Sequence, residues 1–233
     1  MTKPFLKTVI HWKLLASWEV ADLSGIPTRN EMKEALIARN GRQLQETLEA
    51  STVAICGLGG LGSNIAVSLA RAGIGKLILI DFDKVDVSNL NRQQYKASQV
   101  GAYKPDALSR NLKEIAPYIN LISHPVKLNE DNMTDILKDA DIICEAFDDA
   151  EAKAMITNHV LETFPDKYLI TASGMAGLDS ANNITTRKIT DRFYLCGDGV
   201  SDLKEGSSLI ASRVMLCAAH QAHIVLRILA GLE

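Results

Sequence analysis

Four glycines within six residues form the part of the sequence best suited to holding a phosphate. They are Gly57, Gly59, Gly60 and Gly62, and they follow a short apolar run, Thr52–Cys56. Glycines at this spacing let a strand turn sharply into a helix, and they let backbone N–H groups approach a phosphate at the helix N-terminus. The segment therefore predicts a nucleotide-binding loop. The alternative is that these glycines serve only close packing.

An acid further along the chain supports the nucleotide interpretation. Asp81 stands nineteen positions after Gly62, at the end of the next apolar run, Leu77–Asp81. In βαβ units of this size, an acid at that place accepts hydrogen bonds from ribose hydroxyls. NAD is the first nucleotide that such a unit suggests.

The residues after Asp81 favour transfer of a nucleotidyl group over transfer of a hydride. A nicotinamide needs an apolar slot, whereas this segment gathers polar and charged side chains: Asp83, Asn89, Arg92, Gln93 and Lys104. Attack at an α-phosphorus builds negative charge on its oxygens and on the departing pyrophosphate, and fixed cations stabilise that charge. Arg92 and Lys104 are therefore predicted to be catalytic. The alternative for each is an exposed surface charge.

A further carboxylate, Asp148, follows an apolar run at residues 141–146. Ligands of open α/β sheets bind beyond the carboxyl ends of the strands. Mg²⁺ takes one or two carboxylates together with phosphate oxygens and water. Asp148 is therefore predicted to bind Mg²⁺ and to take part in catalysis. The alternative is that it caps the helix that follows.

Alternating strands and helices must position these residues. Buried strands are expected at 52–56, 77–81, 121–126, 141–146 and 168–172, with helices at 63–72, 105–116, 129–139 and 149–163. Residues 184–189 and 193–196 are expected to be antiparallel additions, followed by a helix over 208–232. The predicted fold class is α/β, with a doubly wound, mostly parallel, Rossmann-like sheet. Residues 1–50 are predicted to form an N-terminal helical extension, and residues 51–233 one nucleotide-binding domain.

Composition narrows the class of protein. The 233 residues are 47% hydrophobic with a formal net charge of −3, which excludes a disordered chain and argues against a nucleic-acid partner. There is no signal peptide and no stretch apolar enough for a membrane, so a cytoplasmic location is expected. Four cysteines are too few for a disulfide framework in a chain of this length, and none of them forms a C-x-x-C pair, which argues against a four-cysteine zinc site.

Three segments taken together identify a family resemblance. Gly57-Leu-Gly-Gly-Leu-Gly62, Asp81-Phe-Asp83 and Ser88-Asn-Leu-Asn-Arg-Gln93 closely resemble the ThiF/MoeB family, which is related to the ubiquitin-activating enzymes. The resemblance runs from about Arg39 to the C-terminus. It implies a homodimer that uses ATP and Mg²⁺ to adenylate the C-terminal glycine carboxylate of a small ubiquitin-like protein.

The resemblance also implies roles for single residues. Asp81 would hold the ribose with Asp83 beside it, and Lys104 would contact a phosphate. Asp148 would bind the metal. The glycine loop would hold the phosphates, and the polar cluster over them would be Asn89, Arg92 and Gln93. Asp149 and Lys153 stand where the family usually has Asn and Arg.

Three features depart from the family pattern. Many members bind structural zinc through two C-x-x-C pairs. This chain lacks them, so no zinc is expected, and the chain is similar to the short, zinc-less ThiF proteins of thiamine synthesis. Arg42 resembles a family arginine that reaches the γ-phosphate in the neighbouring subunit, but it lies closer to the glycine loop. Some family members use a cysteine to carry sulfur or to bind the carrier covalently. Cys196 is expected in a glycine-rich loop, where its thiol could be exposed and reactive, and the resemblance implies such a role for it.

The sequence thus predicts an adenylyltransferase that acts on a ThiS-like sulfur-carrier protein. A sulfur donor would then attack the adenylate, and the resulting thiocarboxylate would supply the thiamine thiazole. One alternative is an ATP-dependent dehydratase of a threonylcarbamoyl-modified tRNA adenosine. The others are a non-catalytic module that binds a ubiquitin-like tail, and an NAD-dependent dehydrogenase.

Overall fold

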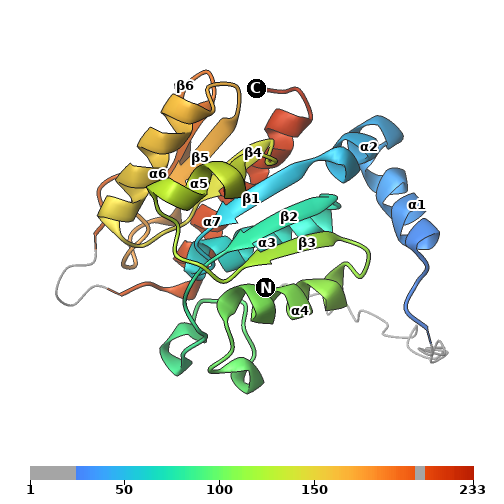
Figure 1. The fold of residues 1–233 in the computed structure, drawn as a ribbon, viewed down its shortest axis with the longest axis horizontal. Helices are drawn as coiled ribbons and strands as arrows, with labels where there is room; N and C mark the ends of the chain where they lie inside the picture. The colour runs from blue at the N-terminus through green and yellow to red at the C-terminus, as the bar shows by residue number, and fades with distance from the viewer. Residues whose placement is uncertain (1–24, 203–207) are drawn as a thin grey trace, which may run out of the picture.

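The computed structural model describes residues 25–202 and 208–233, which form one sheet with helices on both faces (Figure 1). The seven strands lie in the order β3-β2-β1-β4-β5-β7-β6. All neighbouring pairs are parallel except β6 with β7. The predicted α/β, doubly wound, mostly parallel fold is confirmed. The strands are β1 (Thr52–Cys56), β2 (Lys76–Ile80), β3 (Asn120–His124), β4 (Ile142–Glu145), β5 (Tyr168–Ala172), β6 (Thr185–Thr190) and β7 (Phe193–Gly197).

Helices cover both faces of the sheet, as parallel strands require. Helices α2, α3, α4 and α7 pack on one face, and α5 and α6 pack on the other. Short 3₁₀ turns η1 (Val87–Asn89) and η2 (Ala97–Gln99) lie between β2 and α4, and η3 (Ala181–Asn183) precedes β6. The helices are α1 (Arg29–Asn40), α2 (Arg42–Ala50), α3 (Gly60–Ala72), α4 (Lys104–Ile115), α5 (Glu130–Leu137), α6 (Ala150–Thr163) and α7 (Ala211–Leu229).

The central strand β1 is buried on both faces. Val53 and Ile55 join the core beneath α3, α4 and α7, whereas Ala54 and Cys56 join the core beneath α5 and α6. A strand covered on both sides needs apolar residues at every position rather than at alternate ones. This is why the run before the glycine loop is continuously apolar.

The last two strands form a hairpin. β6 pairs antiparallel with β7, with Thr186 opposite Cys196 and a bulge between Lys188 and Thr190. The expected antiparallel pairing is confirmed for these two strands, whereas β7 itself runs parallel to β5. The chain leaves β5 at the carboxyl edge, descends as β6 and turns back. The second arm of the hairpin therefore regains the direction of the parallel set.

The helices before β1 confirm the helical character predicted for this part of the extension. α1 begins with a capping box, in which Thr28 and Glu31 each bond the other's backbone N–H. α2 packs into the core through Leu48, and Gln45 Nε2 donates to the carbonyl of Gly73 at 3.3 Å. A domain boundary at residue 50 stays a prediction, and α2 shares its core with the sheet. Residues 1–24 of the extension lie outside the described residues.

None of the helices within the described ranges combines the length and the apolar character that crossing a bilayer requires.

Candidate active site

A cleft of about 770 Å³ lies at the carboxyl edge of the sheet, beyond β1, β2, β4, β5 and β7. It brings together most of the residues that the sequence singled out. Gly62, Arg42 and Cys196 are not among the residues that line it. The predicted residues in its walls are Gly57, Gly59, Gly60, Asp81, Asp83, Asn89, Arg92, Gln93, Lys104 and Asp148.

Two of the loop glycines are required by backbone packing. Gly57 has a φ of +90°, and a Cβ there would lie 2.8 Å from the carbonyl oxygen of Ala146. A Cβ on Gly62 would lie only 1.8 Å from the carbonyl oxygen of Gly57. Gly59 differs, because its nearest neighbour would be Gln93 Nε2 at 3.7 Å. Packing alone therefore explains Gly57 and Gly62, whereas Gly59 has room for a side chain.

This difference in available space predicts different effects for alanine substitutions at Gly62 and Gly59. Gly62→Ala should lower the free energy of unfolding by about 1–3 kcal/mol, the usual cost of overpacking. Gly59→Ala should change it by less than about 0.5 kcal/mol, as is usual where nothing is crowded. It should nevertheless weaken ATP binding, because Gly59 lines the cleft and a side chain there keeps a phosphate from approaching the backbone closely. Urea unfolding and calorimetric titration with ATP measure the two effects. Unchanged ATP affinity in Gly59→Ala would contradict close approach of a phosphate.

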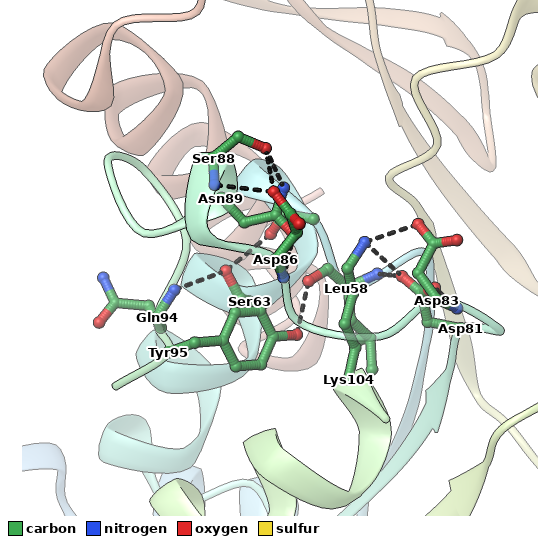
Figure 2. A network of polar contacts seen from close by, with 11 residues as sticks. Leu58, Ser63, Asp81, Asp83, Asp86, Ser88, Asn89, Gln94, Tyr95 and Lys104 are labelled. Carbon is green, nitrogen blue, oxygen red and sulfur yellow. Dashed lines mark hydrogen bonds and ion pairs between the residues drawn. The ribbon is translucent and has the colours of Figure 1, made fainter. Parts of the chain in front are cut away.

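Hydrogen bonds with two side chains hold the backbone of Leu58, which lies within the glycine loop (Figure 2). The N–H of Leu58 donates to Asp81 Oδ2 at 2.7 Å, and the carbonyl of Leu58 accepts from the Tyr95 hydroxyl at 2.7 Å. Asp81 Oδ1 also accepts the N–H of Asp83 at 2.8 Å. Burial raises the pKa of Asp81, against the opposing influence of Lys104 and of the N–H donors. Asp81 thus supports the loop as well as facing the cleft.

Lys104 is buried at the start of α4, so the alternative of an exposed surface lysine is wrong. Its Nζ lies 2.7 Å from Asp83 Oδ2 and 3.8 Å from Asp81 Oδ2 (Figure 2). The side chain of Asp83 is half exposed, so one partner of the ammonium faces solvent. A phosphate would have to share Lys104 with Asp83. The phosphate contact of Lys104 stays a prediction.

Arg92 and Gln93 lie against the glycine loop, with Gln93 Nε2 nearest to Gly59. Arg92 Nη1 donates to the carbonyl of Ser88 at 3.1 Å and to Asn91 Oδ1 at 2.8 Å. The buried Nε of Arg92 and Oε1 of Gln93 have no hydrogen-bond partner among the described residues. Buried polar atoms are rarely left unpaired, because desolvating them is costly. The two side chains thus offer unpaired polar atoms beside the loop.

Asn89 sets the turn that carries these two residues. Its carbonyl accepts the N–H of Arg92 at 3.2 Å and the N–H of Gln93 at 3.0 Å. Its side-chain oxygen accepts the N–H of Asp86 at 3.1 Å and closes the 3₁₀ turn η1. Asn89 lines the cleft and also positions its neighbours.

Asp148 is exposed beyond β4 and makes no hydrogen bond or ion pair within the described residues. The cap of α6 is Asp149, whose Oδ1 accepts the N–H of Ala152 at 2.8 Å, so the capping alternative for Asp148 is wrong. A free carboxylate fits Mg²⁺, which fills its remaining positions with phosphate oxygens and water. Across residues 25–202 and 208–233, no three His, Cys, Asp or Glu side chains are grouped to hold a metal by themselves. A metal at Asp148 would therefore need ligands from the nucleotide.

Glu145 was not among the residues predicted from the sequence. Its carboxylate is fully buried in β4, where it accepts the N–H of Phe147 at 2.7 Å and Lys153 Nζ at 2.9 Å. Lys153 also donates to the carbonyl of Ala172 at 2.9 Å. Burial raises the pKa of Glu145, and Lys153 is the main influence that opposes it. The pair joins the ends of β4 and β5 next to Asp148. One signal in the sequence could have pointed to Glu145: it is the charged residue of the otherwise apolar strand β4.

Cys196 is not in a loop. It lies in β7 and is fully buried, which corrects the expectation of an exposed, reactive thiol. Burial raises the pKa of Cys196 to about 11. The glycines that suggested a loop begin at Gly197, where the strand ends.

The four thiols should therefore be inert in the folded protein, since the thiolate is the reactive form. All four cysteines are buried, and burial also raises the pKa of Cys217 to about 12. With a disulfide reagent at mildly alkaline pH, the native protein should react negligibly over minutes. The same protein in guanidinium should react at all four sites. Fast reaction of one thiol in the native protein would contradict this burial.

Arg42 opens α2, on the amino side of β1 and away from the glycine loop (Figure 1). Its guanidinium lies 3.8 Å from the carboxylates of Glu34 and Glu46, and the side chain is mostly exposed. It does not line the cleft of its own chain. A contact with a neighbouring subunit's nucleotide stays a prediction.

The parallel sheet and the glycine loop at its carboxyl edge are those of a Rossmann-like α/β protein. The model of the ThiF family matches residues 32–233, and the chain belongs to this family.

Curated relatives match the chain over part of its length. It is 33% identical to the adenylyltransferase and sulfurtransferase MOCS3 of Caenorhabditis briggsae, over 60% of the chain and 35% of that protein. It is 30% identical to a sulfur carrier protein adenylyltransferase of Thermus thermophilus, over 59% of the chain and 46% of that protein. It is 38% identical to the molybdopterin-synthase adenylyltransferase of Haemophilus influenzae, over 47% of the chain and 45% of that protein. The chain thus spans less than half the length of these relatives.

Solved structures share the fold at low sequence identity. The tRNA N6-threonylcarbamoyladenosine dehydratase TcdA of E. coli, in complex with ATP, superposes with a TM-score of 0.79 at 18% identity. The match covers 89% of this chain and 98% of TcdA. E. coli MccB, crystallised with AMPCPP and MccA, gives a TM-score of 0.66 at 22% identity, over 83% of this chain and 60% of MccB. At these identities the likeness concerns the fold alone.

Proposed function

We propose that this protein is an adenylyltransferase that transfers AMP from ATP to the C-terminal carboxylate of a sulfur-carrier protein. The observation that carries the proposal is the cleft itself. There, the unpaired N–H donor of Arg92, Nε, lies beside the glycine loop, and the free carboxylate of Asp148 lines the same cleft. This combination suits a triphosphate and its metal. Relatives named as adenylyltransferases support the same reaction.

The proposed chemistry needs positioning and positive charge rather than a strong base. A carboxylate oxygen of the carrier attacks the α-phosphorus of ATP, and the bond from that phosphorus to the pyrophosphate oxygen breaks. The products are the carrier acyl-adenylate and pyrophosphate. Arg92 and Lys104 stabilise the charge that grows on the phosphate oxygens. The nucleophile is already ionised, so bringing it into line with the phosphorus is the main task.

The order of the strands suggests how the nucleotide is oriented across the cleft. Asp81 and Asp83 follow β2, the glycine loop follows β1, Asp148 follows β4, and residues 173–176 follow β5. We propose that the ribose lies over β2 and the phosphates over β1. The attacking carboxylate then approaches from the side of β4 and β5.

Asp148 would hold Mg²⁺, which neutralises phosphate charge when it is bound. The proposal includes no zinc site.

The carrier is proposed to be a ThiS-like protein with a ubiquitin fold and a Gly-Gly end. A sulfur donor would convert its adenylate to the thiocarboxylate used for the thiamine thiazole. The relative named as a sulfur carrier protein adenylyltransferase supports a carrier, while the thiamine pathway rests on the resemblance to short ThiF proteins. A cytoplasmic homodimer in which Arg42 reaches the neighbouring site completes the proposal.

Carrier-dependent exchange between ATP and labelled pyrophosphate tests this function. Exchange should require Mg²⁺ and a ThiS-like carrier, and the carrier should gain the mass of AMP. A carrier that lacks its last glycine is the matched control and should support no exchange. A molybdopterin-pathway carrier, tested in parallel, decides between the two sulfur pathways.

Other results would favour the competing functions. Conversion of threonylcarbamoyl-adenosine in tRNA, without carrier-dependent exchange, would identify a dehydratase. Calorimetric binding of the carrier without ATP turnover would identify a non-catalytic module. NAD binding, followed by fluorescence, would favour a dehydrogenase.

A further inference from the structure

The cleft has a second wall that the nucleotide residues do not use. It is formed by residues 173–176, which follow β5, and residues 199–202, which follow β7 and are preceded directly by Asp198. The two segments are bonded to each other: the N–H of Asp198 donates to the carbonyl of Gly174, and the N–H of Gly199 donates to the carbonyl of Ser173, both at 3.0 Å. The N–H of Ala176 donates to Ser201 Oγ at 3.1 Å. We call these two segments the β5–β7 wall.

A buried ion pair fixes this wall to α7. Arg213 Nη2 bonds to Asp198 Oδ2, and only 4% of each side chain is exposed. Arg213 Nη1 donates to the carbonyls of Asp179 and Ser180, the latter at 3.0 Å. The other carboxylate oxygen of Asp198 accepts the N–H groups of Val200 and Ser201 at 2.9 and 2.8 Å. One guanidinium therefore ties Asp198, directly before the second segment, to residues 179–180, which follow the first segment in the chain.

The Arg213–Asp198 pair lies next to the contact between α7 and the glycine loop. Val214, the next residue after Arg213, lines the cleft, and its Cγ1 would lie 2.8 Å from a Cβ on Gly60. Asp198 is charged at every working pH: burial raises its pKa, but N–H groups of Ser201 and Val200, together with Arg213, lower it to about 2. Breaking one partner of a buried ion pair leaves an uncompensated charge, so this geometry resists distortion.

The wall combines short side chains with a few larger ones. Its cleft-lining residues are Ser173, Gly174, Met175, Ala176, Gly199, Val200, Ser201 and Asp202. The short side chains leave backbone groups accessible to an extended chain. The wall also lies on the β4–β5 side, from which the attacking carboxylate approaches in the proposed function.

We propose that the Arg213–Asp198 pair is a positioning pair that fixes the β5–β7 wall, against which an extended peptide tail ending in glycine lies. The inference rests on the proposed function for the identity of the tail. The pair touches neither substrate. It acts by keeping the wall at a fixed distance from the glycine loop, so that the tail binds in one place.

Asp198→Asn tests the pair: the amide oxygen can still accept the N–H groups of Val200 and Ser201, and urea unfolding measures what the uncompensated charge of Arg213 costs. Amide hydrogen exchange should become faster by about tenfold or more in residues 174–180 and 198–201, and stay unchanged in the glycine loop. The KM for the carrier should rise about tenfold, while the Kd for ATP stays within about twofold and kcat within about threefold. Arg213→Lys keeps the charge but loses the fork, so it should give an intermediate rise in KM.

The control is Arg227→Met, which removes another α7 arginine, paired with the exposed Glu233, away from the cleft. It should leave all these quantities unchanged. Equal losses of carrier and ATP affinity in Asp198→Asn would show a general folding role and overturn the proposal. Unchanged hydrogen exchange or an unchanged carrier KM would overturn it as well. If the wild-type protein shows no carrier-dependent exchange, the proposed function fails, and hydrogen exchange still decides whether the pair fixes the wall.

Discussion

Arg92→Ala should slow carrier-dependent ATP–pyrophosphate exchange by about 10²–10³, the usual cost of removing one fixed donor from a developing negative charge. Arg92 lines the cleft beside the glycine loop, and its buried Nε has no partner among the described residues. Its hydrogen bonds to Ser88 and Asn91 keep the guanidinium in place before substrate arrives. Lys104 is tied to Asp83, so it cannot replace the lost charge.

Two controls separate this effect from misfolding. Arg71→Ala removes an exposed arginine from α3 that does not line the cleft, and it should exchange at the wild-type rate. Arg92→Lys keeps the charge but loses the planar fork, so it should recover only part of the activity. Urea unfolding of Arg92→Ala should match the wild-type protein. Wild-type exchange in folded Arg92→Ala would show that Arg92 is not catalytic.

Lys153→Met should have the largest effect on stability, lowering the free energy of unfolding by about 3–5 kcal/mol. The substitution leaves the Glu145 carboxylate in a strand where its side chain is about 1% exposed, with only backbone N–H groups, of Phe147 and Ala172, to compensate it. It also leaves the carbonyl of Ala172 without its donor. Urea unfolding at fixed pH measures the loss.

The loss should grow as the pH rises. Burial raises the pKa of Glu145 above the ordinary 4.5, so the folded protein binds this proton more tightly than the unfolded chain does. The stability linked to this proton is complete below the unfolded pKa and is lost as the pH rises through the folded pKa. Lys153 limits this loss, because it is the main group that lowers the pKa of Glu145 in the folded protein. The difference between wild type and Lys153→Met should therefore widen between about pH 5 and pH 8.

The double variant Glu145→Gln/Lys153→Met should recover much of the stability, because no charge stays buried without a partner. Lys96→Met is the matched surface control: its partner Glu114 is exposed, so the change should cost less than about 1 kcal/mol. A pH-independent loss in Lys153→Met, equal to that of the double variant, would show that packing rather than charge is responsible.

Short-range sequence patterns predicted most of the fold and the nucleotide side of the cleft. Continuous apolar runs marked the parallel strands, because burial on both faces leaves no polar position. The direction of β7 was not predictable in this way, since its pairing with β5 depends on how the hairpin folds back. The burial of Cys196 within β7 was not predictable either, because a glycine such as Gly197 can end a strand as well as stand in a loop.

Tertiary contacts account for the residues that the sequence did not reveal. Glu145 gains its role from Lys153, which α6 brings back against β4. Arg213 and Asp198 meet only because α7 crosses the end of β7. The two adjacent aspartates before α6 could not be told apart from the sequence, because either residue type suits a helix N-cap. The structure shows that Asp149, not Asp148, is the N-cap of α6.

The outer strand β6 has a consequence for how the protein behaves at high concentration. An outer strand exposes unpaired N–H and carbonyl groups that invite a strand from another molecule. β6 carries Arg187 and Lys188 and is interrupted by a bulge before Thr190. Charge and the added twist of a bulge both disfavour such docking. Fibrous aggregation through this edge of the sheet is therefore discouraged.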